Sequence, residues 1–140
     1  MNVALSPITA ADLPIVKSWY LSYPFLQACY YWANRLERTE PANHQWQLAR
    51  LDAEPVGAVR VRWSKRKNAW VLEELVVAQA RQRQGIAAAI FAQLPRPLVF
   101  KTDADNASAR AFYLAQGCVQ TRELTARSGK PMVEFTCAAS

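Results

Sequence analysis

The stretch LVVAQARQRQGIAAAI, residues 75–90, changes character at its single glycine. An apolar run and a row of basic and amide side chains precede Gly85, and small and apolar residues follow it. This order predicts a strand, a loop and the start of a helix. Backbone N–H groups at such a helix start hold phosphate, and Gly85 lets a ligand approach the backbone closely. The stretch also fits a capped surface helix with a solvated basic start, and one glycine does not decide between the two interpretations.

Length and composition predict one soluble domain over residues 1–140. The chain is 51% hydrophobic and 20% charged, which is ordinary for a globular protein with a single core. We find no apolar run near the roughly 18 residues that span a membrane, and the N-terminal residues lack the pattern of a signal peptide. A cytoplasmic location without membrane association is therefore expected.

Charge and cysteine usage narrow the range of partners. The formal net charge of +6 favours an anionic partner, but the basic residues are spread along the chain and match no nucleic-acid-binding motif, so we expect no nucleic acid. Cys29, Cys118 and Cys137 are far apart, odd in number and without a histidine at metal-ligand spacing. We expect three reduced thiols and no metal site.

Hydrophobic periodicity predicts alternating strands and helices. Helices are expected at 9–22, with Thr9 as N-cap, and at 25–37, 85–94 and 106–117. Strands are expected at 2–8, 46–52, 56–64, 69–78, 97–104, 118–124 and 131–137. The three strands between 46 and 78 should form an antiparallel meander, and the last two a hairpin about residues 128–130. The pattern predicts an α/β domain with a mixed sheet.

Two segments resemble the signature motifs of one enzyme superfamily. LVVAQARQRQGIA (75–87) resembles motif A of the GNAT superfamily of acyl-CoA-dependent N-acyltransferases, in which a strand enters a Q/R-x-x-G-x-G/A loop, here Gln82, Gly85 and Ala87. NASARAFYLAQG (106–117) resembles motif B. Its residues in register are Asn106, Ala109, Phe112, Tyr113 and Gly117. The chain departs from the usual pattern at Gln79, where motif A commonly has proline, and at Cys118, where an aromatic residue often follows the motif B glycine.

The resemblance implies a GNAT fold, a mixed and mostly antiparallel central sheet of about six to seven strands flanked by about four helices. It also implies acetyl-CoA as cosubstrate, with its pyrophosphate on backbone N–H groups of the loop and its pantetheine along the main chain after Glu74. Arg81, Arg83 and Arg110 suit the adenosine phosphates, or are simply solvated. The implied cofactor-binding residues are Leu75, Val76, Val77, Gln82, Arg83, Gln84, Gly85, Ile86, Ala87, Ala88, Asn106, Ala109 and Tyr113.

Acyl transfer to an amine needs a neutral nitrogen and a protonated leaving thiolate. The resemblance makes Tyr113 the candidate general acid, although a helical tyrosine beside Phe112 also fits a core position. Glu73 and Glu74 are candidates for the general base. Because a strand alternates its faces, only one of them should face the acceptor, and the resemblance favours Glu73. A water relay remains an alternative.

Glu73 and His44 also have simpler, structural interpretations. Glu73 also fits an ion pair with Arg60 or Arg62 at a strand edge. His44, the only histidine, is expected on the surface of a loop.

The acceptor is not specified by the sequence. Family acceptor sites lie in the first two helices and their connection, here YLSYPFLQACYYW (20–32), whose aromatic side chains suit a hydrophobic amine, a cation, a core or a dimer interface. We expect an acetyl-CoA-dependent N-acetyltransferase acting on a primary amine of a small molecule or protein, with a homodimer left open. The alternative is a non-catalytic acyl-CoA-binding sensor or scaffold.

Overall fold

The computed structural model describes residues 2–22 and 43–138 of the 140. Its strands are β1 (Val3–Pro7), β2 (His44–Leu51), β3 (Glu54–Ser64), β4 (Ala69–Val77), β5 (Leu98–Asp103), β6 (Val119–Thr125) and β7 (Pro131–Cys137). Its α-helices are α1 (Leu13–Ser22), α3 (Ile86–Ala92) and α4 (Ala107–Ala115), with 3₁₀ turns η1 (Ala10–Asp12) and η3 (Gln79–Arg81). The helix expected at 25–37 lies outside the described residues, and within them no helix is long and apolar enough to cross a membrane.

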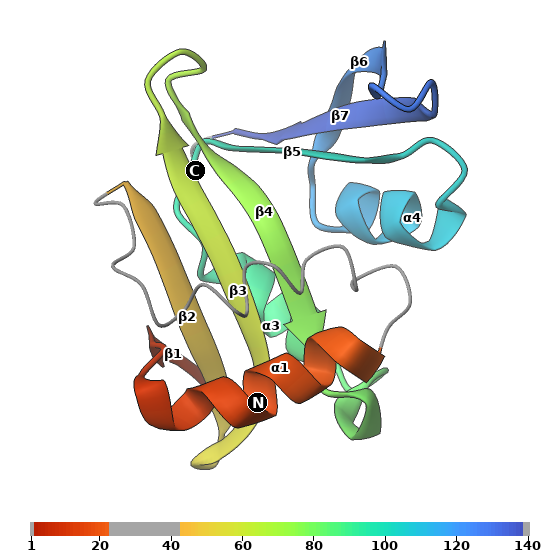
Figure 1. Ribbon diagram of the computed structural model, residues 1–140. Helices are drawn as coiled ribbons and strands as arrows, with labels where there is room; N and C mark the ends of the chain where they lie inside the picture. The colour runs from red at the N-terminus through yellow and green to blue at the C-terminus, as the bar shows by residue number, and fades with distance from the viewer. Residues whose placement is uncertain (1, 23–42, 139–140) are drawn as a thin grey trace. The chain divides into compact units, whose positions relative to one another are not determined.

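Hydrogen bonds join the strands in the order β1-β2-β3-β4-β5-β7-β6 (Figure 1). The pairs β1–β2, β2–β3, β5–β7 and β6–β7 are antiparallel. Strands β4 and β5 are parallel and pair at Trp70–Leu98 and Val71–Val99. The predicted α/β class with a mostly antiparallel sheet is confirmed.

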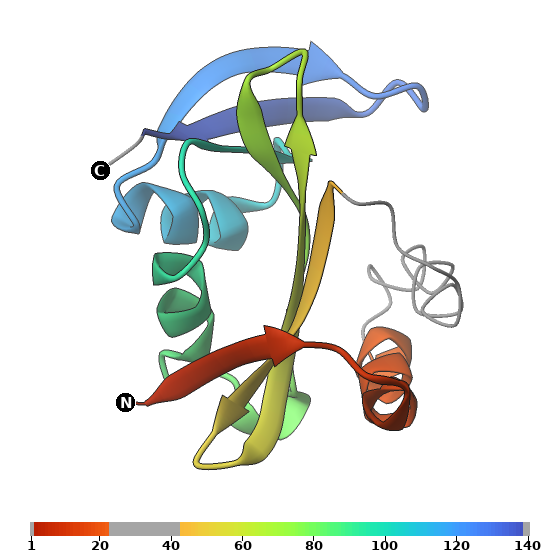
Figure 2. The same cartoon turned by 90° about the vertical axis from the view of Figure 1, so that its left-hand side faces the viewer.

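The chain divides into two compact units, and the first comprises Met1–Arg62 and Glu73–Gln93. Within it, α1 and α3 lie on opposite faces of the strands (Figure 2). The side of α1 that packs on the sheet is apolar at helical spacing, as predicted. The core cluster on this side consists of Val16, Trp19, Tyr20, Trp46, Leu48, Ala58 and Val76. Burial of each of the larger side chains stabilises the folded state by about 1.5–3 kcal/mol.

Strands β3 and β4 approach closely at Gly57. A Cβ added there would lie 2.6 Å from the carbonyl oxygen of Val76 and 3.2 Å from Cδ1 of Ile90 on α3. The Ala78 N–H also donates to the Val56 carbonyl at 2.8 Å. Only a residue without a side chain fits this crossing, so Gly57 sets where the end of β4 lies against β3.

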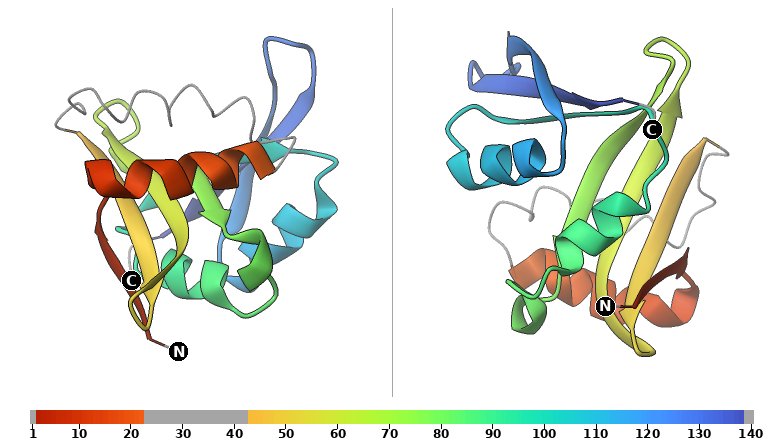
Figure 3. Two further views of the ribbon diagram at one scale, coloured as in Figure 1. Left: turned by 60° about the horizontal axis from the view of Figure 1, so that its bottom comes forward. Right: turned by 180° about the vertical axis from the view of Figure 1, so that it is seen from behind.

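The second unit comprises Trp63–Leu72 and Leu94–Ser140. In it α4 covers one face of β5 and β7 (Figure 3). Asn106 caps the start of α4, since its Oδ1 accepts the Ala109 N–H at 3.1 Å. Gly117 follows the helix with φ +85°, the left-handed conformation that commonly ends a helix. The predicted boundaries at 106 and 117 are confirmed.

Cys118 and Cys137 are joined by a disulfide, so the prediction of three reduced thiols is wrong. Both residues are buried, and their Cα atoms are 4.4 Å apart. The hairpin causes this proximity, because Val119 pairs with Thr136 and the next residues outward are the two cysteines. Sequence spacing alone does not show which positions of two strands lie opposite each other.

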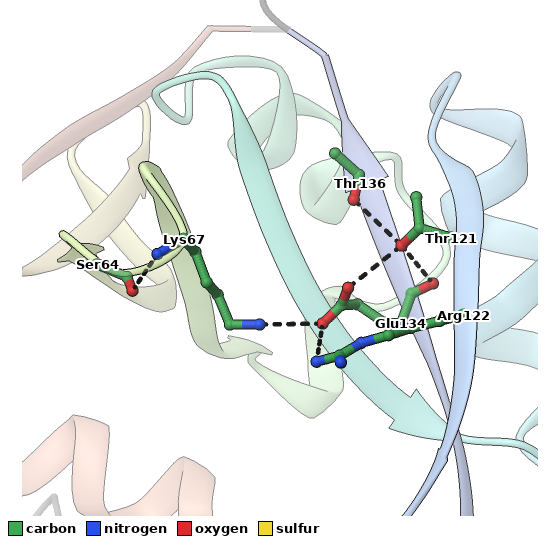
Figure 4. A network of polar contacts seen from close by, with 6 residues as sticks. All are labelled: Ser64, Lys67, Thr121, Arg122, Glu134 and Thr136. Carbon is green, nitrogen blue, oxygen red and sulfur yellow. Dashed lines mark hydrogen bonds and ion pairs between the residues drawn. The ribbon is translucent and has the colours of Figure 1, made fainter.

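Glu134 on β7 is the centre of a polar network (Figure 4). Its Oε2 accepts hydrogen bonds from Lys67 Nζ and Arg122 Nη2, both at 3.1 Å. Thr121 Oγ1 lies 3.3 Å from Glu134 Oε1. The carboxylate is buried but fully engaged, as a buried charge requires.

Candidate active site

The loop after β4 has the backbone that the sequence predicts. Gly85 is the N-cap of α3 with φ +81°, a conformation that favours glycine. The side chains of Gln82, Arg83 and Gln84 are exposed, whereas Ile86 is buried and anchors the helix. The first N–H groups of α3 have no earlier turn to bond to, so they can donate to a ligand. Ala87 and Ala88 keep this first turn free of large side chains.

The three arginines considered for the adenosine phosphates differ in how they are engaged. Arg81 forms an ion pair with Glu54, and Arg83 is exposed with φ +63°. Arg110 on α4 donates to the Ala104 carbonyl at 2.8 Å and to Gln120 Oε1 at 3.3 Å. Of the three arginines considered for the adenosine phosphates, Arg83 is therefore the most accessible.

Leu75, Val76 and Val77 complete β4 before this loop. Val76 is buried in the core beside α1, while Leu75 and Val77 are half-buried. That the main chain of these residues contacts the pantetheine stays a prediction.

Glu73 is surrounded by three nitrogen-bearing side chains. Its Oε2 accepts a hydrogen bond from Arg60 Nη1 at 2.9 Å. Its Oε1 lies 3.3 Å from Arg62 Nε and 3.3 Å from His44 Nε2. Arg60 is fully buried and stacks 5.5 Å above the Trp46 ring. The simpler interpretation of Glu73, an ion pair with Arg60 and Arg62, is confirmed.

Glu74 is buried and accepts a hydrogen bond from the Tyr20 hydroxyl on α1. The Tyr20 ring in turn meets the Trp46 ring edge to face, with centroids 6.4 Å apart. Tyr20, the first of the aromatic residues considered for an acceptor site, is thus part of the core. The others, between 23 and 32, lie outside the described residues.

The two glutamates do not face opposite sides of the sheet. Trp46 and Arg60 are cross-strand partners, so their side chains lie on the same face of the sheet. Glu73 is on this face because it binds Arg60. Glu74 is on the same face because it binds Tyr20, whose ring contacts that of Trp46. Two consecutive side chains on one face are the pattern that a β-bulge produces. The expected alternation is therefore wrong at this point, and strand parity cannot choose between the two carboxylates.

His44 is not a loop residue, contrary to expectation. It begins β2, pairs with Arg62 across the hairpin, and its side chain is only 11% exposed. A one-residue register shift at Ala49–Arg50 brings His44 opposite Arg62 and Trp46 opposite Arg60. Without that shift each of these β2 residues would lie opposite the neighbouring residue of β3, whose side chain points to the other face of the sheet. The sequence carries no clear signal for such a shift, which is why the cluster around Glu73 was missed.

The motif B residues lie in the second unit, and α4 carries them. Asn106 holds the start of the helix through the Ala109 N–H. Tyr113 is half-buried among aromatic rings, 4.1 Å from the Phe100 centroid and 5.7 Å from that of Phe135. Burial raises the pKa of Tyr113 above its usual 10.0, so its hydroxyl keeps the proton through neutral and mildly alkaline pH. Both interpretations of Tyr113, proton donor and core aromatic, agree with this environment.

Comparisons with known proteins point to one family. The family model described as the acetyltransferase (GNAT) family matches residues 13–118. A GNAT-family acetyltransferase from Desulfovibrio desulfuricans has a similar structure at TM-score 0.81 and 18% identity, covering 98% of this chain and 99% of the other. No curated protein sequence matches significantly.

Two further solved structures share the fold. The ribosomal-protein-S18-alanine N-acetyltransferase of Escherichia coli has a TM-score of 0.71 at 14% identity, covering 99% of this chain and 96% of the other. A streptothricin acetyltransferase of Bacillus anthracis, solved with acetyl coenzyme A, has a TM-score of 0.63 at 16% identity, covering 74% and 66%.

Proposed function

Because the chain belongs to the acetyltransferase (GNAT) family, we propose that it transfers the acetyl group of acetyl-CoA to a primary amine of a small molecule or protein. The single observation that carries this proposal is the family match over residues 13–118, which includes both the β4–α3 loop and α4. A solved neighbour holds acetyl coenzyme A, which supports the same cosubstrate here.

In this proposal the backbone of Gln82 through Ala88 binds the pyrophosphate. Donors at the start of α3 and the exposed Arg83 favour an anion there. The main chain of Leu75, Val76 and Val77 binds the pantetheine, and Asn106 and Ala109 hold the start of the helix that carries Tyr113.

The neutral amine nitrogen attacks the thioester carbonyl, the C–S bond breaks, and the thiolate of coenzyme A takes a proton. The acylated nitrogen then loses its excess proton to solvent, and solvent restores the proton of the donor. Tyr113 supplies that proton in the proposed mechanism, since its raised pKa keeps the phenol protonated. The amine must first lose a proton to a base on its own side. Glu73 and Glu74, buried or partly buried on β4, are the carboxylates assigned to that side.

The proposal is tested with acetyl-CoA and a panel of amines, reading the released thiol and the mass of the product. The panel includes streptothricin and a peptide beginning with alanine, which the names of two of the structural neighbours suggest. We expect thiol release that depends on the amine and a product heavier by one acetyl group. Cofactor binding without turnover on any amine would instead indicate an acyl-CoA-binding sensor.

A further inference from the structure

We propose that the disulfide between Cys118 and Cys137 is a thiol–disulfide switch for α4. The intact bridge holds the C-terminal end of this helix in place, and its reduction lets that end move and slows acetyl transfer. The inference rests on the proposed amine acetylation, because the switch acts through Tyr113, the proposed general acid. It assigns a regulatory site to two residues that neither motif contains.

Packing holds α4 less firmly than it holds the other two helices. None of the residues of α4 is buried, and its best-covered side chains, those of Ala109, Arg110, Phe112 and Tyr113, are only half-buried. By contrast, four residues of α1 and three of α3 are buried. Because a helix in a protein is stabilised mainly by the apolar face that it buries, the position of α4 depends on its other attachments.

The two ends of α4 are attached in different ways. In its first half, Arg110 donates a hydrogen bond to the Ala104 carbonyl at 2.8 Å. Just beyond its C-terminal end, the Cys118 N–H donates to the Tyr113 carbonyl at 3.2 Å, and the Cys118 side chain is bonded to Cys137. The disulfide is therefore separated from the backbone of Tyr113 by a single hydrogen bond.

The bridge fastens α4 to two firmly packed strands. Cys137 ends β7 and lies opposite Leu98 on β5. On these strands Leu98, Phe100 and Phe135 are at most 2% exposed. The Tyr113 ring packs on the same strands, with its centroid 4.1 Å from that of Phe100 and 5.7 Å from that of Phe135. The bridge thus fixes the backbone of Tyr113 to the surface on which its ring lies, and Cys118 and Cys137 act as positioning residues.

A reductant can reach the bridge through local opening of the hairpin. Cys118 and Cys137 are buried, but the residues that follow them, Val119 and Ala138, are exposed. Both cysteines lie at strand ends, and β6 is the outermost strand of the sheet. Strand ends open more readily than buried strand centres, so separation of the Val119–Thr136 pair exposes the sulfur atoms.

The switching reaction is an exchange with a dithiol, which is the reductant that the proposal requires. A thiolate of the reductant attacks one sulfur of the bridge, the S–S bond breaks, and a mixed disulfide forms. The second thiol of the reductant then displaces the protein sulfur and closes its own disulfide. The protein gains two electrons and two protons as two thiols, and the reductant loses them.

The first experiment is hydrogen–deuterium exchange of the oxidised protein and of the protein reduced with dithiothreitol, with the state of the bridge checked by peptide mass. Amides in the last turn of α4 should exchange several-fold faster after reduction. Amides of α1, which contains no cysteine, should keep their rates. Unchanged exchange in α4 would overturn the switch.

The matched control is the double variant Cys118→Ser, Cys137→Ser, which retains Cys29. Its α4 should exchange at the fast rate with and without dithiothreitol. A response of this variant to the reductant would assign the effect to Cys29 and overturn the switch. If the double variant does not fold, the reduced wild type answers the same question, because it needs no substitution.

The second experiment measures kcat in both redox states with an amine that is acetylated. The readout is the mass of the acetylated product, because dithiothreitol and coenzyme A both carry thiols. Reduction should lower kcat by about 10- to 100-fold, since a small displacement of a catalytic group has effects of this size. Reoxidation should restore kcat. An equal kcat in the two states would overturn the switch.

Tyr113→Phe separates an effect through Tyr113 from a general loss of order. If the bridge acts by placing the Tyr113 hydroxyl, reduction should lower kcat of this variant much less than kcat of the wild type, because the two changes remove the same interaction. An equal fold-loss in both proteins would overturn the assigned role of the bridge. No turnover with any amine in either redox state would instead contradict the proposed function, and exchange in α4 would still decide whether the bridge holds the helix.

Discussion

At the scale of single residues, the clearest chemical prediction concerns Tyr113, the proposed general acid. Its ring lies among those of Phe100, Phe112 and Phe135, and burial raises the pKa of its hydroxyl. At neutral pH the hydroxyl therefore carries the proton that it would donate. Tyr113→Phe should lower kcat by about 10²- to 10⁴-fold while leaving acetyl-CoA affinity nearly unchanged. The alkaline limb of the rate profile, expected above pH 10.0 because the pKa is raised, should disappear as well. Lower thermal stability with unchanged turnover would identify Tyr113 as a core aromatic only.

A substitution at Gly85 tests whether the loop between β4 and α3 binds acetyl-CoA. Gly85→Glu places bulk and negative charge where the pyrophosphate is expected, so calorimetry should show weaker binding of acetyl-CoA. The substitution also strains a backbone at φ +81°. Gly129→Glu is the matched control, because Gly129 has φ +87° in the β6–β7 turn with open space around it. Equal loss of affinity in both variants would mean that strain, and not the loop, explains the result.

At the scale of the elements, the sequence predicts the order and bounds well where one face is buried. The apolar spacing of α1 and the cap and glycine of α4 bound both helices in agreement with the structure. Two local irregularities of the strands were not predicted. They are the register shift of one residue at Ala49–Arg50 and the placement of Glu73 and Glu74 on the same face. Both depend on pairing between strands, and hydrophobic alternation within one strand does not report it. The cluster around His44 was missed for this reason, although Glu73 was identified.

The crossing of β3 and β4 gives a prediction at this scale. Gly57→Ala adds a Cβ whose ideal position is 2.6 Å from the Val76 carbonyl oxygen, so one strand must move. We expect a loss of about 1–3 kcal/mol in the free energy of unfolding, measured by chemical denaturation. Ala126→Gly, at a half-buried position between the end of β6 and the β6–β7 turn, is a control that exchanges the same two residue types without a crossing. A Gly57→Ala variant as stable as the wild type would show that the strands separate easily here.

At the scale of the whole molecule, the disulfide closes a segment of 19 residues in sequence separation. Replacing Cys118 and Cys137 together by serine should lower the free energy of unfolding by about 3 kcal/mol, because the unfolded chain gains freedom. Denaturation with and without reductant measures this, and reductant should not affect the double variant. Disulfides are uncommon in cytoplasmic proteins, so peptide mapping of the protein isolated from cells bears directly on the expected location. Separate Cys118 and Cys137 peptides from the unreduced protein would contradict the bridge.

Acid should unfold the molecule in part through Glu134. Burial alone would raise the pKa of Glu134, but hydrogen bonds from Arg122 and Lys67 outweigh it and hold the pKa below its usual 4.5. A carboxyl with a depressed pKa in the folded state stabilises the fold above the unfolded value, and this contribution is lost as the pH falls through the folded value. Stability of the wild type should therefore decrease below about pH 4.5, whereas Glu134→Gln should be less stable at neutral pH and show a shallower decrease in acid. Urea denaturation at a series of pH values measures both, with exposed Glu123→Gln as control. If the Glu134→Gln and wild-type curves stay parallel from neutral pH to acid, other carboxyl groups control acid unfolding.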